Sequence, residues 1–529
     1  MSLLSVSGLN VTIGATPILR DVSLSVEPGR VLGVIGESGA GKSMTALAIM
    51  GLLPAGARAD GAAILEGADL LGKSEREMCT IRGRDIGMVF QEPATALDPL
   101  QTIGQQVAET ILVHTGASRR DALVEADRAL ARAGLSQEHF PRDRFPHDLS
   151  GGQRQRVVIA SAIALRPKLL IADEPTTALD VTTQARVIAL FRSLVDEEGM
   201  GLIFITHDLA LVTGLADDIA VMRSGEIVDG GATREVFRSL AHPYTRQLFE
   251  ASSHVPVRDP ALRGGAPVLE VTDVARDYLR PPRRVFGPPG AFRAVDGVSF
   301  SIGRGENVGL VGESGSGKST LARAILGLDR VQAGSIVIDG TALDDSDRAT
   351  RRKVQAVFQD PYGSFDPRQR VDTLVTEPFH LLGNEAPRGA ERRQRAEAAL
   401  ETVGLNVADV DKYIHEFSGG QRQRIAIARA LIIEPKLIVL DEAVSALDVS
   451  VRAQILDLLA ELSDRLSISY LFISHDLGVV RAVTDRVLVM KAGKIVETGR
   501  TDKVFASPQH PYTRELIAAA PSLSRALAG

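Results

Sequence analysis

The sequence has little of what secreted, metal-cluster or membrane-spanning proteins need. It holds one cysteine, Cys79, which excludes an internal disulfide and a cysteine-ligated metal cluster. No run of 18 apolar residues is free of charge, so we expect no transmembrane helix. The N-terminus has no basic start followed by an apolar run, and we expect no signal peptide. These absences favour a reducing cytoplasm, and any role at a membrane then requires partner subunits.

The balance of residue types is that of an ordinary globular protein. Hydrophobic residues make up 44% of the 529 positions and charged residues 24%. This length indicates two to four domains. The formal net charge of −6 gives no general attraction to nucleic acid. Basic clusters such as Arg351–Lys353 are interpreted as solvated faces.

The chain is a tandem repeat. The motifs that occur twice are Gly36–Ser43 and Gly312–Ser319, Gln91 and Gln359, Ser150–Arg156 and Ser418–Arg424, Asp173-Glu174 and Asp441-Glu442, His207 and His475, and His242–Arg246 and His510–Arg514. The copies are 268 positions apart, except that Lys42 and Lys318 are 276 apart. The first copy therefore carries eight extra residues before Gln91, which we place around Pro54–Gly67. So long a period indicates duplicated domains rather than a solenoid.

The domain boundaries follow from this repeat and from composition. Residues 251–267 are rich in proline, glycine and charge, as is usual in a linker. We therefore predict one domain over residues 1–250, a linker over 251–267 and a second domain over 268–529. A second irregular stretch, Arg280–Phe292, is interpreted as a loop inserted near the start of the second copy.

Short apolar runs alternate with helical patterns inside each copy. The runs that suit buried parallel strands are Val31–Ile35, Ile86–Phe90, Leu169–Ala172 and Leu202–Ile205. Gln153–Leu165 is apolar on more than one face and predicts a buried helix, and Thr102–Leu135 predicts a helical side subdomain. The predicted fold class is therefore α/β, with a mostly parallel sheet in each copy.

The repeated glycine-rich motif has the spacing of a phosphate-binding P-loop. Gly36–Ser43 follows an expected strand and precedes an expected helix, which is the context that such a loop needs. Its glycines let backbone N–H groups turn toward phosphate oxygens, and the helix N-terminus adds a positive dipole end. Lys42 can reach the β- and γ-phosphates, and the Ser43 hydroxyl can ligate Mg²⁺. Gly312–Ser319 repeats this arrangement, so the sequence predicts two ATP sites.

An acidic pair supplies the remaining chemistry of a phosphoryl-transfer site. The apolar run Leu169–Ala172 delivers Asp173 near the Mg²⁺, and Glu174 can face the attacking water as a general base. Asp441-Glu442 repeats the pair at the end of another apolar run. We therefore predict that ATP is hydrolysed.

Further motifs resemble those of the ATP-binding cassette (ABC) ATPases. Leu149–Gln153, with the sequence LSGGQ, is similar to the signature motif of that family, and Phe417–Gln421 is its near-copy. The resemblance covers almost the whole chain. It implies Q-loop glutamines at the metal (Gln91 and Gln359), switch histidines beside the γ-phosphate (His207 and His475) and D-loops (Thr177–Asp180 and Ser445–Asp448).

In this family two cassettes face each other head to tail, and each ATP lies between the P-loop of one and the signature of the other. The resemblance implies a first site built from Gly36, Glu37, Ser38, Gly39, Ala40, Gly41, Lys42, Ser43, Met44, Gln91, Asp173, Glu174 and His207, with Ser418, Gly419, Gly420 and Gln421. It implies a second site built from Gly312, Glu313, Ser314, Gly315, Ser316, Gly317, Lys318, Ser319, Thr320, Gln359, Asp441, Glu442 and His475, with Ser150, Gly151, Gly152 and Gln153. The implied Mg²⁺ ligands are Ser43, Gln91 and Asp173 in the first site and Ser319, Gln359 and Asp441 in the second. Because each half keeps its glutamate, we expect two competent sites in an intramolecular pseudo-dimer.

One position departs from the family pattern. The family stacks adenine on an aromatic residue near the first strand, and Tyr278 fits that place in the second copy. The first copy has Ile13 there. We therefore expect weaker discrimination between ATP and GTP at the site that contains Lys42.

Finer details resemble the oligopeptide, dipeptide and nickel importers. These are the segments Phe90–Pro99 and Phe358–Pro367 and the two His-Pro-Tyr-Thr-Arg tails, with a D-type half before an F-type half. Length and order are similar to fused members that serve microcin-type peptide or glutathione uptake. The resemblance implies a peripheral ATPase at the cytoplasmic face of the inner membrane, two transmembrane permease subunits and a periplasmic or extracellular substrate-binding protein. We expect no nucleic-acid partner and, with Cys79 alone, no iron–sulfur cluster.

The main alternative is a soluble twin-cassette protein that acts on ribosomes or DNA. Such translation factors usually carry a long charged helical linker, whereas residues 251–267 are short and proline-rich. DNA-repair members insert coiled coils or zinc-binding cysteines, which this sequence lacks. An exporter is a third possibility. The sequence does not name the substrate, and glutathione and nickel stay open beside peptides.

Overall fold

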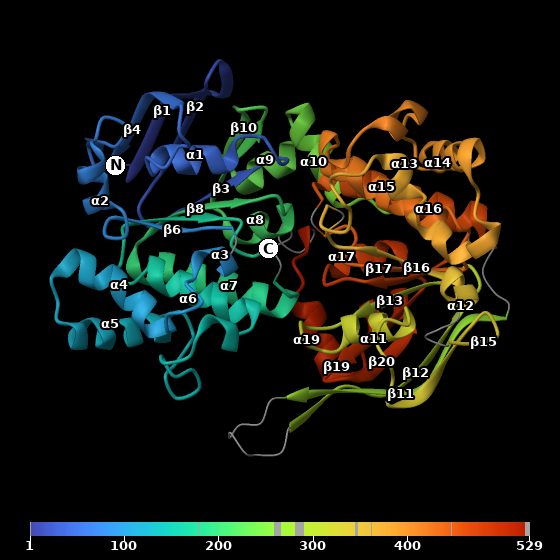
Figure 1. The fold of residues 1–529 in the computed structure, drawn as a ribbon. Helices are drawn as coiled ribbons and strands as arrows, with labels where there is room; N and C mark the ends of the chain where they lie inside the picture. The colour runs from blue at the N-terminus through green and yellow to red at the C-terminus, as the bar shows by residue number, and fades with distance from the viewer. Residues whose placement is uncertain are drawn as a thin grey trace. The chain divides into compact units, whose positions relative to one another are not determined.

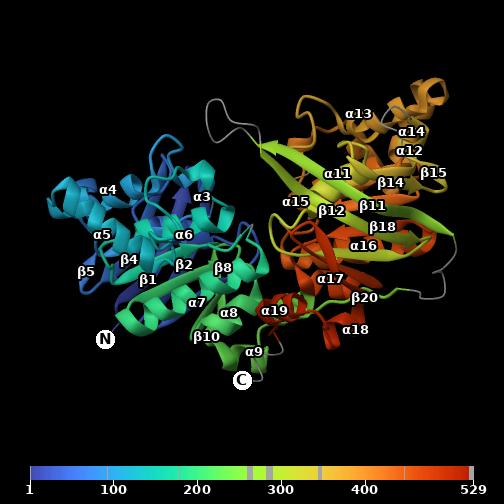
Figure 2. The same ribbon diagram turned by 90° about the horizontal axis from the view of Figure 1, so that it is seen from below.

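The computed structural model describes residues 2–91, 93–177, 179–258, 266–280, 290–343, 348–360, 362–445 and 447–523. The described residues divide into two compact units, 2–253 together with 521–523, and 254–520. Figure 1 shows residues 2–253 in blue to green and the second unit in yellow-green to red, and Figure 2 shows both from below. Each unit is described by itself.

A six-stranded sheet forms the centre of the first unit. Its order within the described residues is β10 (Glu226–Ala232), β9 (Asp218–Arg223), β3 (Val31–Ile35), β8 (Gly201–Thr206), β7 (Leu169–Asp173) and β6 (Ile86–Val89). Neighbouring strands are parallel except for the edge strand β10, which pairs antiparallel with β9. The residues of β3 and β8 are all buried, because helices cover both faces of a parallel sheet. All four runs predicted as strands are strands of this sheet, and the α/β fold class is confirmed.

The second unit repeats this sheet. The order is β16 (Val354–Phe358), β17 (Leu437–Asp441), β18 (Ser469–Ile473), β13 (Asn307–Val311), β19 (Arg486–Lys491) and β20 (Lys494–Arg500). Again only the edge strand β20 runs antiparallel. In both units the strand before the P-loop lies in the middle of the sheet, so its carboxyl end opens between two parallel neighbours.

Each unit also has an antiparallel four-stranded sheet, which the sequence did not predict. In the first unit the order is β2 (Thr16–Val26), β1 (Leu4–Ile13), β4 (Ala57–Leu65) and β5 (Ala68–Asp69), and in the second β12 (Gly290–Gly303), β11 (Pro267–Arg280), β14 (Ala333–Ile338) and β15 (Thr341–Ala342). The ends of the stretch that was interpreted as a loop belong to β11 and β12. Its residues 281–289 lie outside the described residues.

Helices complete each unit. In the first these are α1 (Lys42–Ile49), α2 (Glu75–Ile81), α3 (Pro93–Ala96), α4 (Ile103–Thr115), α5 (Arg119–Arg132), α6 (Gly151–Ala162), α7 (Val181–Glu198), α8 (Leu209–Leu215), α9 (Thr233–Ser239) and α10 (Pro243–Ser252). In the second they are α11 (Lys318–Ile325), α12 (Arg348–Lys353), α13 (Val371–Val375), α14 (Gly389–Thr402), α15 (Gly419–Leu431), α16 (Val449–Leu466), α17 (Leu477–Val483), α18 (Thr501–Ala506) and α19 (Pro511–Ala519).

The predicted helical subdomain is present in the first unit. It consists of α4 and α5, which pack on each other and on α6 (Figure 1). The single predicted segment is broken at Gly116, whose left-handed backbone ends α4, and at Ser118, whose side chain caps α5. Helix α6 ends at Ala162, three residues before the predicted Leu165.

The eight extra residues of the first copy lie in two places. Three precede Gly61, since Gly51 and Gly61 are ten positions apart and their counterparts Gly327 and Gly334 are seven. This makes β4 nine residues long where β14 has six. The other five fall between Leu70 and Gln91, beyond the stretch in which the sequence placed them.

The described part of residues 251–267 divides between the two units, with 251–253 in the first and 254–258, 266 and 267 in the second. Ala251 and Ser252 end α10 of the first unit. His254 lies 2.7 Å from Oδ1 of Asp457, and Arg258 donates to the carbonyl of Val483 at 2.6 Å, both in the second unit. Residues 259–265 of the stretch lie outside the described residues.

Candidate active site

Each P-loop connects the central strand of its sheet to the following helix, β3 to α1 and β13 to α11. Gly36 has a φ of 153°, and a Cβ there would lie 2.3 Å from the carbonyl oxygen of Met222 at the end of β9. Gly41 has a φ of 102° and faces Leu19 at 2.5 Å. Gly312 and Gly317 repeat both constraints. Only glycine fits these positions, so the loop closes tightly around the end of the strand.

The P-loop lysine is buried against its own loop. Nζ of Lys42 donates to the carbonyls of Gly36 at 2.8 Å and Glu37 at 3.0 Å. Lys318 makes the same two bonds at 2.7 and 2.9 Å. Helices α1 and α11 begin without a side-chain cap on their first N–H groups. The loop therefore offers a cation and the first N–H groups of a helix in one place, which suits phosphate oxygens.

The remaining residues predicted in the P-loops lie around these lysines. Ala40 and Ser316 accept hydrogen bonds from Gly225 and Gly493, which ties each loop to the turn after β9 or β19. Met44 and Thr320 stand in the first turn of α1 and α11. The others, Ser38, Gly39, Ser314 and Gly315, form the exposed tip of each loop.

The acidic pair lies beside the P-loop of the same half. Asp173 ends β7 and accepts a hydrogen bond of 3.1 Å from the hydroxyl of Ser43. Burial raises the pKa of Asp173. In the second half, burial and the neighbouring Glu442 charge raise the pKa of Asp441 to about 6. Two of the three side chains that were predicted to ligate Mg²⁺ in the first half, Ser43 and Asp173, are therefore in contact, while the third, Gln91, donates to Glu174.

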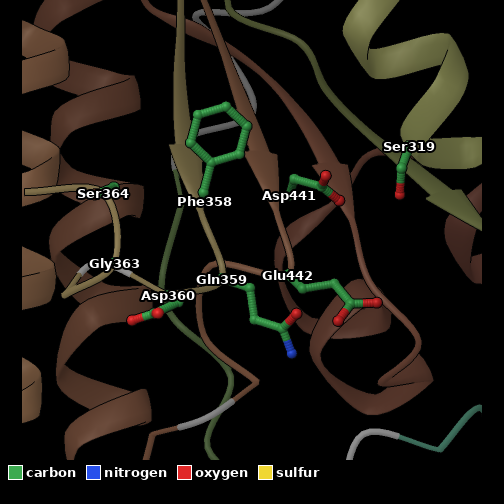
Figure 3. A pocket seen from close by; sticks show the side chains of 8 residues that line it. All are labelled: Ser319, Phe358, Gln359, Asp360, Gly363, Ser364, Asp441 and Glu442. Atoms are coloured by element: carbon green, nitrogen blue, oxygen red, sulfur yellow. The ribbon is translucent and has the colours of Figure 1, made fainter. Parts of the chain in front are cut away.

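In the second half the same residues line a pocket of about 510 Å³. Figure 3 shows Asp441 and Glu442 at the end of β17, Gln359 after the neighbouring strand β16, and Ser319 across from them at the start of α11. Phe358 also lines this pocket. The fold thus brings four predicted residues from three elements to the carboxyl edge of the sheet, where ligands of such sheets bind.

The glutamate after each aspartate has a strained backbone. Glu174 has a φ of 46° and Glu442 a φ of 52°, in the left-handed region that side chains other than glycine rarely adopt. Their N–H groups donate to Ile205 at 2.9 Å and to Ile473 at 2.8 Å, in the adjacent strands β8 and β18. The bond to the next strand holds this conformation, which turns the carboxylate out of the sheet.

Three side chains hold the carboxylate of Glu174. Nδ1 of His207 lies 3.3 Å from it, the hydroxyl of Thr177 donates at 3.0 Å and the amide of Gln91 donates at 3.0 Å. Burial acts to raise the pKa of Glu174, but the bonds and charges of His207, Lys42 and Thr177 outweigh it and lower the pKa. Glu174 is therefore ionised at neutral pH, as a general base must be.

The second half has a similar arrangement with two differences. One is that Ser445, the counterpart of Thr177, donates to the backbone carbonyl of Glu442 at 2.9 Å; the other concerns Gln359. Nδ1 of His475 lies 3.1 Å from the Glu442 carboxylate, and this contact lowers the pKa of Glu442 against the effect of burial. Burial acts to lower the pKa of His475, yet the bond to Glu442 raises it overall. Gln359 donates to the hydroxyl of Ser445 at 3.5 Å, whereas its counterpart Gln91 reaches the glutamate itself.

The signature residues begin the helices α6 and α15. Ser150 and Gln153 form a capping box, in which the serine hydroxyl accepts from the backbone of Gln153 and the glutamine oxygen accepts from the backbone of Ser150. Ser418 and Gln421 repeat it. The intervening glycines differ, since Gly151 and Gly419 are exposed while Gly152 and Gly420 are half-buried. Each signature therefore starts a capped helix with an exposed first residue.

The register of the antiparallel sheets supports the pairing of Ile13 with Tyr278. Each residue lies five positions after a residue with a left-handed backbone in the first strand, Gly8 in β1 and Asp273 in β11. The Tyr278 hydroxyl donates to Asp329 at 2.9 Å, and the guanidinium of Arg276 lies 4.8 Å from its ring centre. The adenine-stacking role of Tyr278 stays a prediction.

Sequence reasoning missed several residues at the site. Thr177 was noticed only as part of a D-loop, although its hydroxyl holds Glu174. Tyr244 and Tyr512 were noticed only as part of a repeated tail, although each hydroxyl accepts a backbone N–H of its P-loop. The exact repetition of the tail was the available signal, but the contact joins residues some 200 positions apart, 207 in the first copy and 199 in the second.

Two further observations concern only the described residues. Within this part of the chain, no helix combines the length and apolar character that a membrane span requires. Nor do the described histidines, cysteines and carboxylates form a group of three that could hold a metal ion.

Comparisons with known proteins agree with the motifs. The ABC transporter family matches residues 19–177 and 295–445, and the family described as oligopeptide/dipeptide transporter, C-terminal region, matches residues 496–528. The glutathione import ATP-binding protein GsiA of Salmonella typhimurium is 44% identical over 558 residues, which cover 98% of this chain and 89% of that protein. GsiA of Escherichia coli (strain K12) is 44% identical over 539 residues, covering 95% and 86%.

A solved structure gives a match of domain size. It is the dimer of an ATP-binding cassette in a post-hydrolysis state, bound to ADP and Pi, and it is 30% identical to this chain. The match covers 44% of this chain and 98% of that cassette, with a TM-score of 0.39.

Proposed function

This chain belongs to the ABC transporter family and is an ATPase of that family, and from this premise we propose that it energises the import of peptides or of a modified peptide such as glutathione. The observation that carries the proposal is the agreement of two findings over different parts of the chain. The relatives called glutathione import ATP-binding proteins match 98% of it, and the oligopeptide/dipeptide transporter region matches its last residues.

The two halves form two ATP sites together. Each half has its own P-loop, aspartate, glutamate, glutamine and histidine, and each has a signature helix with an exposed glycine at its start. We assign one site to the P-loop of Lys42 with Gly419, and the other to the P-loop of Lys318 with Gly151. The two domains span residues 1–250 and 268–529, and the linker 251–267 keeps each half at a high effective concentration for the other.

The residues of each site have different roles in binding and hydrolysing ATP. The P-loop N–H groups and Lys42 bind the phosphates of ATP, while the N–H groups of the opposite signature bind the γ-phosphate. Glu174 accepts a proton from water while the water oxygen bonds to the γ-phosphorus. The bond between the γ-phosphorus and the oxygen of ADP breaks, and ADP leaves with its electron pair. His207, already in contact with Glu174, orients this carboxylate and the γ-phosphate.

The residues at each site fit a Mg²⁺ ion. Mg²⁺ prefers oxygen ligands and is commonly held by one or two protein groups together with phosphates and water. Ser43 and Asp173 meet at 3.1 Å in the first half, and Ser319 and Asp441 line one pocket in the second. The amide oxygen of Gln91 or Gln359 would be a further ligand. A Mg²⁺ ion held by these residues would neutralise phosphate charge and help to orient the γ-phosphate for attack by water.

Transport requires partners that this chain does not contain. We propose two transmembrane permease subunits, a periplasmic or extracellular substrate-binding protein, and a peripheral position at the cytoplasmic face of the inner membrane. Apolar side chains are exposed beside each Q-loop, with Phe90 42% and Leu100 85% exposed in the first half and Phe358 39% and Tyr362 44% exposed in the second. Such side chains suit contact with permease helices.

Reconstitution tests this function. The chain is co-purified with its permease subunits, placed in liposomes with the binding protein, and supplied with labelled glutathione and ATP. We expect ATP-dependent uptake that is lost in the double variant Lys42→Ala and Lys318→Ala and kept in Lys503→Ala, an exposed lysine in α18 outside the sites. ATP turnover without uptake of glutathione or of short peptides contradicts the importer, and co-purification with ribosomes or DNA supports the alternative class instead.

A further inference from the structure

The repeated His-Pro-Tyr-Thr-Arg tail has a contact that its sequence did not reveal. Tyr244, in the first turn of α10, accepts a hydrogen bond from the backbone N–H of Glu37 at 3.3 Å. Tyr512, in the first turn of α19, accepts one from the backbone N–H of Glu313 at 2.8 Å. Each tyrosine is 2% exposed. The last helix of each half therefore touches the second residue of the P-loop, and it does so in both copies.

The other residues of the tail hold the tyrosine in place. Nδ1 of His242 accepts the N–H of Tyr244 at 3.2 Å and so caps α10, and Pro243 occupies the first position, where no donor is needed. The Thr245 hydroxyl donates to Asp229 in β10 at 2.6 Å, and Arg246 donates to the carbonyl of Leu240 at 3.0 Å. Every residue of the motif thus fixes the start of this helix.

In the second half, similar hydrogen bonds with slightly different partners hold the start of α19. His510 caps α19 by accepting the N–H of Tyr512 at 3.1 Å. The carboxylate of Glu497 in β20 accepts the backbone N–H groups of Gln509 and His510 at 2.8 and 2.9 Å. Because these bonds join the start of α19 to the edge strand β20, the position of the Tyr512 hydroxyl does not depend on the P-loop.

A cation also packs on each tyrosine ring. The Arg223 guanidinium lies 4.9 Å from the ring centre of Tyr244, and the Lys491 ammonium lies 4.4 Å from that of Tyr512. Both cations end the strand next to the P-loop strand, β9 or β19. A cation over the face of an aromatic ring is attractive and restricts the ring further. The ring is held from the strand and its hydroxyl reaches the loop.

The P-loop residue that meets the tyrosine is held from two sides. The carbonyl of Glu37 accepts from Nζ of Lys42 at 3.0 Å while its N–H donates to Tyr244. In the second half, Glu313 has the same pair of bonds, from Lys318 at 2.9 Å and to Tyr512. When a lysine turns to a phosphate, its bond to this carbonyl is lost. The bond to the tyrosine then remains to keep the start of the loop in shape.

We propose that Tyr244 and Tyr512 are positioning residues, each of which holds the entrance of its P-loop in the conformation that binds phosphate. The C-terminal helix of each half is thereby part of the nucleotide site of that half. The proposal rests on the proposed role of the P-loops. It predicts that loss of the hydroxyl alone weakens nucleotide binding, since an ordered loop costs less free energy to fill than a loose one.

Tyrosine-to-phenylalanine substitutions test this, because phenylalanine keeps the packed ring and removes only the hydroxyl. Each is measured in a full-length chain with one functional P-loop: Tyr244→Phe in the Lys318→Ala background and Tyr512→Phe in the Lys42→Ala background. The Kd for ATP is measured by equilibrium dialysis. We expect each Kd to rise roughly two- to tenfold, which corresponds to the loss of one ordinary hydrogen bond.

The matched control is Tyr470→Phe. Tyr470 lies in β18 with its hydroxyl buried and without a hydrogen-bond partner among the described residues, so its loss is expected to leave the Kd unchanged. In the assembled transporter, the double variant Tyr244→Phe and Tyr512→Phe is expected to raise the KM for ATP and keep the kcat. The tyrosines do not touch the reacting atoms, and thermal unfolding of the variants shows whether the fold is intact.

The outcomes separate this proposal from the proposed function. If both lysine substitutions abolish binding at their sites while the phenylalanine variants bind like their parents, the P-loops bind ATP and the positioning role is wrong. A fall in kcat at constant KM, or an equal effect of Tyr470→Phe, also contradicts it. If the lysine substitutions leave ATP binding unchanged, the P-loop assignment itself fails.

Discussion

The two neighbouring glycines of each signature have different surroundings, and their substitutions are expected to separate stability from activity. A Cβ at Gly151 meets nothing within 4 Å, whereas a Cβ at Gly152 lies 2.2 Å from Cγ2 of Thr183 in α7. In the second half Gly419 is open, and Gly420 faces Cγ1 of Val451 at 2.3 Å. We predict that alanine at the second glycine destabilises its half, and that alanine at the first affects only ATP turnover.

The magnitude follows from the contacts of Thr183. Its hydroxyl donates to Asp180 at 3.1 Å and its N–H to the same carboxylate at 3.0 Å, in the cap of α7. The methyl group therefore cannot move aside without breaking a bond in this cap. Overpacking of this kind costs about 1–3 kcal/mol. At about 2–4 °C per kcal/mol for a domain of this size, Gly152→Ala lowers the Tm by roughly 2–12 °C.

Gly151→Ala has the opposite profile. Alanine is a better helix former than glycine and meets open space, so we expect no loss of stability. Its methyl group, however, stands on the exposed helix start that we assign to the γ-phosphate of the Lys318 site. Loss of one charge-assisted hydrogen bond there lowers ATP turnover by at least about tenfold.

Thermal unfolding of the full chain and ATP turnover of the assembled transporter measure the two effects. Gly214→Ala in α8, where a Cβ also meets nothing within 4 Å, is the control for the substitution itself. The reasoning is refuted if Gly151→Ala lowers the Tm as much as Gly152→Ala, or if Gly151→Ala and Gly419→Ala together leave the turnover unchanged.

Three further predictions concern the two sites. Glu174→Gln and Glu442→Gln, made separately, each lower ATP turnover in the assembled transporter, because a general base contributes roughly 10²–10⁴-fold; a single variant with the wild-type rate contradicts two competent sites. Burial and the Glu442 charge raise the pKa of Asp441 to about 6 from 3.8, so the folded nucleotide-free chain loses stability as pH rises through this window. Asp441→Asn therefore raises the free energy of unfolding by about 1–3 kcal/mol above pH 6, and this gain shrinks toward pH 4. Denaturant titration at several pH values measures it, and a gain that is the same at all of them contradicts this cause. Since Ile13 stands where the other half has Tyr278, ATP and GTP compete more equally at the first site, measured with the other P-loop lysine replaced; equal preference at both sites removes the idea.

Much of the fold was predictable because the buried strands are short apolar runs. Val31–Ile35 and Leu202–Ile205 have no polar side chain to place, so they suit only the interior of a parallel sheet. The antiparallel sheet was missed for the converse reason. The strand Ala57–Leu65 contains exposed, charged and small residues, and its pairing with β1 depends on contacts far along the chain.

The candidate site was predictable in its residues and not in its geometry. Spacing around Gly36–Ser43 and the Asp173-Glu174 pair pointed to phosphate chemistry. The left-handed backbone of Glu174 has no local signal, because the bond to Ile205 in another strand imposes it. Likewise Tyr244 contacts its P-loop only because α10 returns to the end of β9, and no pattern within the tail predicts that return.

The central claim is that each ATP is shared between the two halves of the chain. An experimental structure of the assembled transporter with Glu174→Gln and Glu442→Gln, bound to Mg²⁺ and ATP, measures this directly. The account predicts one γ-phosphate between Lys42 and the N–H groups at Gly419, and the other between Lys318 and those at Gly151. Triphosphates that contact the P-loop of one half and no signature residue of the other contradict it.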